Sequence, residues 1–114
     1  MDETKLYIFW CNFMDWLWQR TESFPKTCRY TLSNRIDNLS LDILEGIVEA
    51  TYSSKERKVV ILREMNLKLE KMRVILRIAF QRKHLHSQSF SYASAQLQEA
   101  GRMVGGWLKN REES

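Results

Sequence analysis

Hydrophobic positions recur every three or four residues along most of the chain, which is the spacing of one face of an α-helix. The spacing predicts helices over about residues 4–21, 28–52, 54–82 and 90–110. No stretch alternates between apolar and polar positions as a half-buried strand does. Helices with one apolar stripe each and short connections are typical of an up-down-up-down four-helix bundle. We therefore expect an all-α fold, with residues 1–114 forming a single domain.

The third predicted helix carries apolar residues on two opposite sides. Its main seam consists of Leu62, Met65, Leu69, Met72, Leu76 and Ala79. A second apolar row consists of Val60, Leu67, Val74 and Ile78. A monomeric bundle would leave this second row in water, next to an aromatic-rich first helix that includes Trp16 and Trp18. A continuous stripe of this kind indicates a homo-oligomer interface, and the alternative is that other parts of the same chain cover the row.

The chain is short for an enzyme. It has 114 residues, of which 44% are hydrophobic and 28% are charged. A domain of this size buries only about two-thirds of the surface of its unfolded chain, so catalytic machinery would compete with the core for residues. The available candidates are carboxylates of the second helix (Asp42, Glu45 and Glu49) and the loop histidines His84 and His86. A solvated acidic face and solvated histidines are the commoner meanings, so we expect no catalysis, metal or cofactor.

Two cysteines, Cys11 and Cys28, are too few for a disulfide framework and lack the paired spacing of a zinc site. This count predicts a reducing, cytoplasmic setting. No motif supplies either cysteine with a histidine partner, so we expect small buried side chains rather than nucleophiles. The acidic start of the chain does not resemble a secretory signal. The apolar run over residues 6–18 is too short to span a bilayer. It predicts a buried helix, with a membrane-surface helix as a minor alternative.

Positive charge is concentrated on the third predicted helix. The chain has a formal net charge of +4 and a pI near 9.2. Ten basic and three acidic residues lie between Lys55 and Lys83, so the rest of the chain is net negative. A basic helix of this kind suits an acidic partner such as RNA, DNA or an acidic protein surface.

The candidate binding residues follow from this charge pattern. Arg73 and Arg77 lie one turn apart on one flank of the seam, and Lys68, Lys71 and Arg82 line the other flank. Further electrostatic candidates are Lys83, Lys26, Arg29 and Arg35. Such rows can follow a phosphate backbone without reading bases. The alternative is a solvated basic face that pairs with the acidic second helix, including that of a neighbouring subunit.

Glycines at positions 101, 105 and 106 lie among alanines in the fourth predicted helix. Small residues permit the close approach of another helix or a bulky ring. We expect these glycines to face the tryptophans of the first helix, which is a packing role rather than a functional one.

Two segments carry a family resemblance. One is Phe24-Pro25-Lys26 followed by Arg29-Tyr30-x-Leu32-x-x-Arg35-Ile36, and the other is Glu99-Ala100-Gly101-Arg102-Met103-Val104-Gly105-Gly106-Trp107-Leu108. The chain resembles, over nearly its whole length, the accessory variability determinant (Avd) family of diversity-generating retroelements. The resemblance implies a four-helix bundle that assembles as a homopentameric barrel with a basic surface. It also implies a non-catalytic role with a reverse transcriptase and its template RNA in mutagenic complementary-DNA synthesis. By motif, Arg73 and Arg77 match the family's Arg-x-x-x-Arg pair.

A related group shares the Phe-Pro-Lys turn, namely the four-helix proteins encoded in intervening sequences of bacterial ribosomal RNA. The second helix of that group ends in Asn-Ile-Ala-Glu-Gly, whereas this chain has Asp42-Ile43-Leu44-Glu45-Gly46. The tryptophan-bearing fourth helix favours Avd. The alternative function is a structural bundle that acts by protein-protein assembly.

Overall fold

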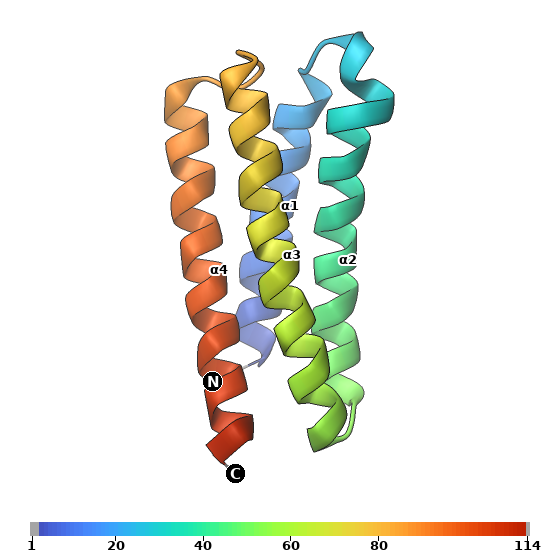
Figure 1. Cartoon of the computed structure of the whole chain (residues 1–114), viewed down its shortest axis with the longest axis vertical. Helices are drawn as coiled ribbons and strands as arrows, with labels where there is room; N and C mark the ends of the chain where they lie inside the picture. Colours follow the sequence, from blue (N-terminus) through green and yellow to red (C-terminus); the bar gives the residue numbers. More distant parts are fainter. Residues whose placement is uncertain (1–2, 114) are drawn as a thin grey trace.

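The computed structural model describes residues 3–113, with side chains described for residues 3–110. It consists of α1 (Glu3–Glu22), α2 (Asn34–Tyr52), α3 (Lys55–Gln81) and α4 (Ser87–Glu113). Each helix runs antiparallel to the one before it, as Figure 1 shows, in a bundle measuring 46 × 24 × 20 Å. Residues 3–113 contain no strand, so the prediction of an all-α four-helix bundle is confirmed. The ring or barrel assembly stays a prediction.

The connection between α1 and α2 is itself helical. A 3₁₀ turn, η1 (Lys26–Cys28), leads into a π-helical turn, η2 (Arg29–Ser33), before α2 begins. Pro25 precedes η1 in an extended conformation, and its carbonyl accepts a hydrogen bond of 2.9 Å from the Cys28 N–H. The predicted second helix began at about residue 28, so its first six residues are not α-helical. The periodicity missed this difference because the five residues of η2 form only about one turn, which is too short for α and π spacing to be told apart.

Both ends of α3 are capped. The Ser54 hydroxyl accepts a hydrogen bond of 3.3 Å from the Arg57 N–H at the start of the helix. At the other end, the N–H of Lys83 donates to the Phe80 carbonyl and that of His84 to the Ala79 carbonyl, each at 2.9 Å. Together with a φ of 67° at Lys83, these bonds form a Schellman motif. The helix bounds agree with the prediction to within one residue.

The fourth helix begins three residues earlier than predicted. Residues 84–89 were expected to form a loop, but α4 starts at Ser87, and the Phe90 N–H donates to the His86 carbonyl at 2.9 Å. The prediction was wrong because the first turn consists of short polar residues, which are favourable near a helix N-terminus but add nothing to an apolar pattern. The helix also continues to Glu113, beyond the predicted end.

The core lies along the bundle axis, and all six residues of the main α3 seam are buried in it. Two tryptophans of α1 donate hydrogen bonds to the same fully buried serine of α2. The Trp10 Nε1 donates to the Ser40 carbonyl at 2.9 Å, and the Trp18 Nε1 donates to the Ser40 hydroxyl at 2.9 Å. Phe80 of α3 stacks on Phe90 of α4, with ring centroids 4.6 Å apart. None of the helices in residues 3–113 combines the length and apolar character that crossing a bilayer requires.

The expected role of the α4 glycines is wrong. A Cβ atom built at Gly101, Gly105 or Gly106 meets no atom within 4 Å, so these residues do not face the tryptophans of α1. The close approach occurs instead at Gly46, where a Cβ would lie 3.0 Å from both Cγ and Sδ of Met65. The glycine of α2 therefore lets the α2 and α3 backbones pack closely.

Candidate functional site

The outward face of α3 has the apolar row at its centre. Leu67 is 57% exposed and Val74 is 59% exposed, and Val60 and Ile78 are also exposed. No other part of residues 3–110 covers this row, so the alternative of coverage by the same chain does not hold for these residues. The outward face of α3 therefore exposes apolar side chains to solvent in the single subunit.

One basic flank of α3 forms a groove with α2. Lys68 and Lys71 of α3 meet Arg35 of α2 around a groove of about 450 Å³, which Val74 also lines. One carboxylate, that of Asp42, lies in the same groove. Three cations from two helices thus surround one carboxylate, which leaves the groove positive.

The other basic flank faces α4. The Phe80 ring stacks on Phe90, so the side of α3 that carries Phe80 faces α4. Arg77 and Arg73 lie three and seven residues before Phe80 and therefore share this side of the helix. The Arg73 Nε lies 3.1 Å from Glu70 Oε1 and the side chain is about one-third exposed. Arg77 is exposed and forms no ion pair with any described residue. Arg77 is therefore the freer of the two cations.

The remaining candidates gather at one end of the bundle. The α1–α2 and α3–α4 connections lie side by side there, at the top of Figure 1. They touch where the Cys28 sulfur lies 3.3 Å from His84 Nε2 and where the His84 ring packs against Phe24. This contact brings Lys26 and Arg29 to the same end as Arg82 and Lys83.

The contact between His84 and Cys28 was not predicted from the sequence. His84 was expected to be a solvated loop histidine, but it is half-buried and is a hydrogen-bonding partner of Cys28. The two residues are 56 positions apart, and no local motif could pair them. Both cysteines are free thiols, of which Cys28 is buried as expected and Cys11 is only partly buried. Among the described residues, no group of three or more His, Cys, Asp or Glu side chains is placed to hold a metal ion.

The acidic side chains of α2 neutralise only some of the basic side chains of α3. Arg57 and Glu49 form an ion pair of 3.0 Å, and Lys68 shares a small hollow with Glu45 and Glu64. Of the nine candidate cations, Arg73 alone forms an ion pair with a described residue. Most of the candidate charge is therefore not neutralised within the subunit.

The two tryptophans predicted at an oligomer interface have partners inside the bundle. Trp18 donates to Ser40, as described above. The Trp16 ring packs against Tyr92 of α4 at 4.6 Å, and the Arg20 guanidinium lies 5.3 Å from the Trp16 ring centroid. Both tryptophans stay half-buried, so their remaining surface is smaller than that of Leu67 or Val74 in relative terms.

Sequence comparison then decides the family. A family model described as bAvd-like matches residues 5–111, which is nearly the whole chain. The chain belongs to the bAvd-like family. No curated protein matches it. The bAvd-like match confirms the resemblance read from the two segments and makes the chain an accessory protein of the Avd type at the level of the family. The relation to the ribosomal RNA intervening-sequence group stays a prediction.

Proposed function

We propose that this chain is a non-catalytic accessory protein of a diversity-generating retroelement. It binds the reverse transcriptase and the template RNA or complementary DNA through its basic surface and supports mutagenic retrohoming in the cytoplasm. The observation that supports this most directly is the outward face of α3, whose cations are mostly unpaired within the subunit. Family membership agrees with this role.

The geometry suits a phosphate backbone. The α2–α3 groove holds Arg35, Lys68 and Lys71 around one hollow, and Arg73 and Arg77 lie on the opposite flank of the same helix. Contacts between such cations and phosphates release counterions, so the affinity should fall steeply as salt is added. These contacts position a strand without reading its bases.

We test the role of the two motif arginines with the double variant Arg73→Ala, Arg77→Ala. Its affinity for RNA or polymerase should fall while light scattering shows an unchanged oligomer. For single-stranded RNA, the slope of log K against log salt should flatten by about 0.7 for each lost phosphate contact. The matched control is Arg102→Ala, which removes an exposed α4 cation already bonded to Glu99 at 3.0 Å. Unchanged RNA and polymerase binding at several salt concentrations would remove both arginines from the proposal.

The exposed apolar row supports a homo-oligomer, which we propose to be a pentamer. Val60, Leu67, Val74 and Ile78 would face one neighbouring copy. The free surface of Trp16 and Trp18 lies on α1, behind α3 in Figure 1, and would face another copy. A ring requires a heterologous contact in which two different surfaces of each copy meet. Closure would place several basic α3 helices in one assembly and multiply the positive field.

A second candidate is a structural assembly module of the intervening-sequence type. The ion pair between Arg57 of α3 and Glu49 of α2 favours this module, because a cation of the basic helix is neutralised by α2. In that case the partner is another protein and the basic face only balances acidic neighbours. If neither RNA nor single-stranded DNA is retained at low salt, the structural module stands and the nucleic-acid role fails.

A further inference from the structure

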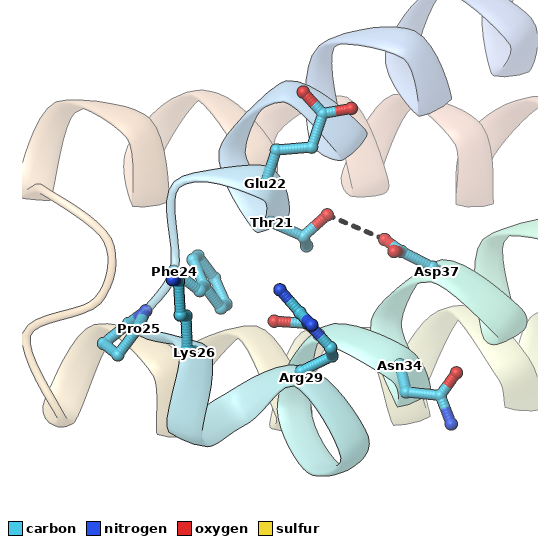
Figure 2. Close-up of a pocket in the computed structure, with 9 residues that line it drawn as sticks. Thr21, Glu22, Phe24, Pro25, Lys26, Arg29, Asn34 and Asp37 are labelled. Carbon is cyan, nitrogen blue, oxygen red and sulfur yellow. Dashed lines mark hydrogen bonds between the residues drawn. The ribbon is translucent and has the colours of Figure 1, made fainter.

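A polar hollow of about 510 Å³ lies between the end of α1 and the start of α2. Thr21 comes from α1, Asp37 and Asn34 come from α2, and Lys26 and Arg29 come from the helical turns between them (Figure 2). Its volume falls within the range of about 300–1,000 Å³ that is usual for small-molecule sites. The hollow is separate from the α2–α3 groove and shares no lining residue with it.

Asp37 is a half-buried carboxylate with spare acceptor capacity. Its Oδ1 accepts a hydrogen bond of 2.8 Å from the Thr21 hydroxyl. Burial raises the pKa of Asp37, and the Glu22 charge adds to the increase, while the Thr21 hydrogen bond opposes it. A carboxylate has about four acceptor sites, and residues 3–110 supply a donor to one of them. Hydrogen-bond donors from a ligand would offset the cost of burying this charge.

Two cations, Lys26 and Arg29, and a second carboxylate, that of Glu22, line the hollow together with Asp37. The Arg29 side chain extends into the space between Phe24 and Asp37 (Figure 2). Neither Arg29 nor Lys26 forms an ion pair with any residue that the structure describes. The hollow therefore offers separate positive and negative groups, which suit a ligand that carries both an anion and hydrogen-bond donors.

We propose that this hollow binds one guanine nucleotide of single-stranded RNA, with the Asp37 carboxylate on the base and Lys26 and Arg29 on the phosphates. The inference rests on the nucleic-acid role proposed above. Unstacked bases in single strands are read at their Watson–Crick edges. Guanine presents two adjacent donors there, N1–H and the 2-amino group, which match the two oxygens of a carboxylate. On their Watson–Crick edges, adenine, cytosine and uracil each place a hydrogen-bond acceptor beside the donor. A carboxylate oxygen repels that acceptor.

The experiment compares three labelled RNA pentamers by fluorescence anisotropy at one low salt concentration. They carry guanine, inosine or uracil at the centre of four uridines. The guanine pentamer should bind at least about fivefold more tightly than the uracil pentamer, which is the lower end for a bidentate base contact. Inosine lacks the 2-amino group and should fall between them. In Asp37→Asn the guanine preference should drop below about twofold, because an amide offers one acceptor in place of two.

The control variant separates base reading from backbone attraction. Lys71→Ala removes a cation from the α2–α3 groove and should weaken all three pentamers by a similar factor, so that the guanine preference stays. Binding of all pentamers with equal affinity, or an intact guanine preference in Asp37→Asn, would overturn the guanine site and leave the proposed function standing. Absence of binding by every pentamer would overturn both the guanine site and the nucleic-acid role in the proposed function.

Backbone amide shifts of the unmodified protein provide a second readout that does not depend on how a variant folds. Addition of the guanine pentamer should shift the amides of Thr21, Arg29 and Asp37 more than addition of the uracil pentamer does. Equal shifts at these amides for the two pentamers would contradict the assignment.

Discussion

Lys83 occupies the left-handed position at the end of α3 where glycine is the usual residue. This conformation costs an L-residue about 1–2 kcal/mol, and glycine adopts it without that strain. Glycine also increases the conformational entropy of the unfolded chain, which offsets part of the gain in stability. We expect Lys83→Gly to raise the free energy of unfolding by about 1 kcal/mol in urea titrations. Lys83→Ala is the control, since it removes the charge but keeps the strained backbone. Equal stability of the two variants would show that the charge and not the backbone matters.

Asp37 should make stability depend on pH in the direction opposite to most aspartates. Its folded pKa is raised by burial, so the folded chain binds more protons than the unfolded chain between the ordinary and the raised pKa. Its contribution is therefore most favourable below the ordinary pKa and is lost as pH rises through the folded value. Because solvent reaches the group, Asp37→Asn should add only about 0.5 kcal/mol at pH 7. In acid unfolding series, the difference should vanish below about pH 4.

At the scale of elements, the glycines of α4 and α2 should respond differently to alanine. Gly101 and Gly105 have open space around the added methyl group, so Gly101→Ala and Gly105→Ala should each stabilise the isolated subunit by about 0.5–1 kcal/mol. Gly46→Ala should gain less or lose stability, because buried Met65 must move to admit the new methyl group. Thermal unfolding of the three variants provides the test. A gain at Gly46 as large as at Gly101 would contradict the close packing of α2 on α3.

The helices themselves were predictable from the chain because each buries one stripe. The residues from Leu62 to Ala79 that form the seam are buried as expected, since their three-and-four spacing is longer and more regular than that of the second apolar row of the same helix. The element boundaries were less predictable. The first turn of α4 carries no apolar signal of its own, so periodicity placed that start late. The single π turn before α2 contains Leu32 and continues the apolar pattern, so periodicity placed the start of α2 early.

The candidate surface was predictable in composition but not in arrangement. The charge excess of α3 is visible in the sequence, and the exposure of Leu67 follows from helical spacing. The convergence of Arg35 with Lys71 depends on how α2 packs against α3, which spacing within one helix does not specify. The same is true of Thr21 and Asp37, which lie 16 residues apart across the helical connection.

At the scale of the whole molecule, the exposed row of α3 should control assembly. Leu67→Glu places a charge at the centre of the row, where burial against another copy would require desolvation of a carboxylate. We expect it to shift light scattering from an oligomer to a single subunit at micromolar concentration, with helicity unchanged. Val48→Glu is the matched control, because Val48 is an exposed apolar residue of α2 outside the row. An oligomer that persists in Leu67→Glu would contradict an interface centred on this row.

The start of α1 and the end of α4 lie at the end of the bundle opposite to Lys26, Arg29 and Arg82 (Figure 1). A fluorescent reporter or an immobilisation tag joined to either terminus therefore emerges away from those three cations. Every molecule attached to a sensor chip in this way presents the end with Lys26, Arg29 and Arg82 to the flowing solution. The same polarity sets the direction in which two fused domains would extend from the bundle.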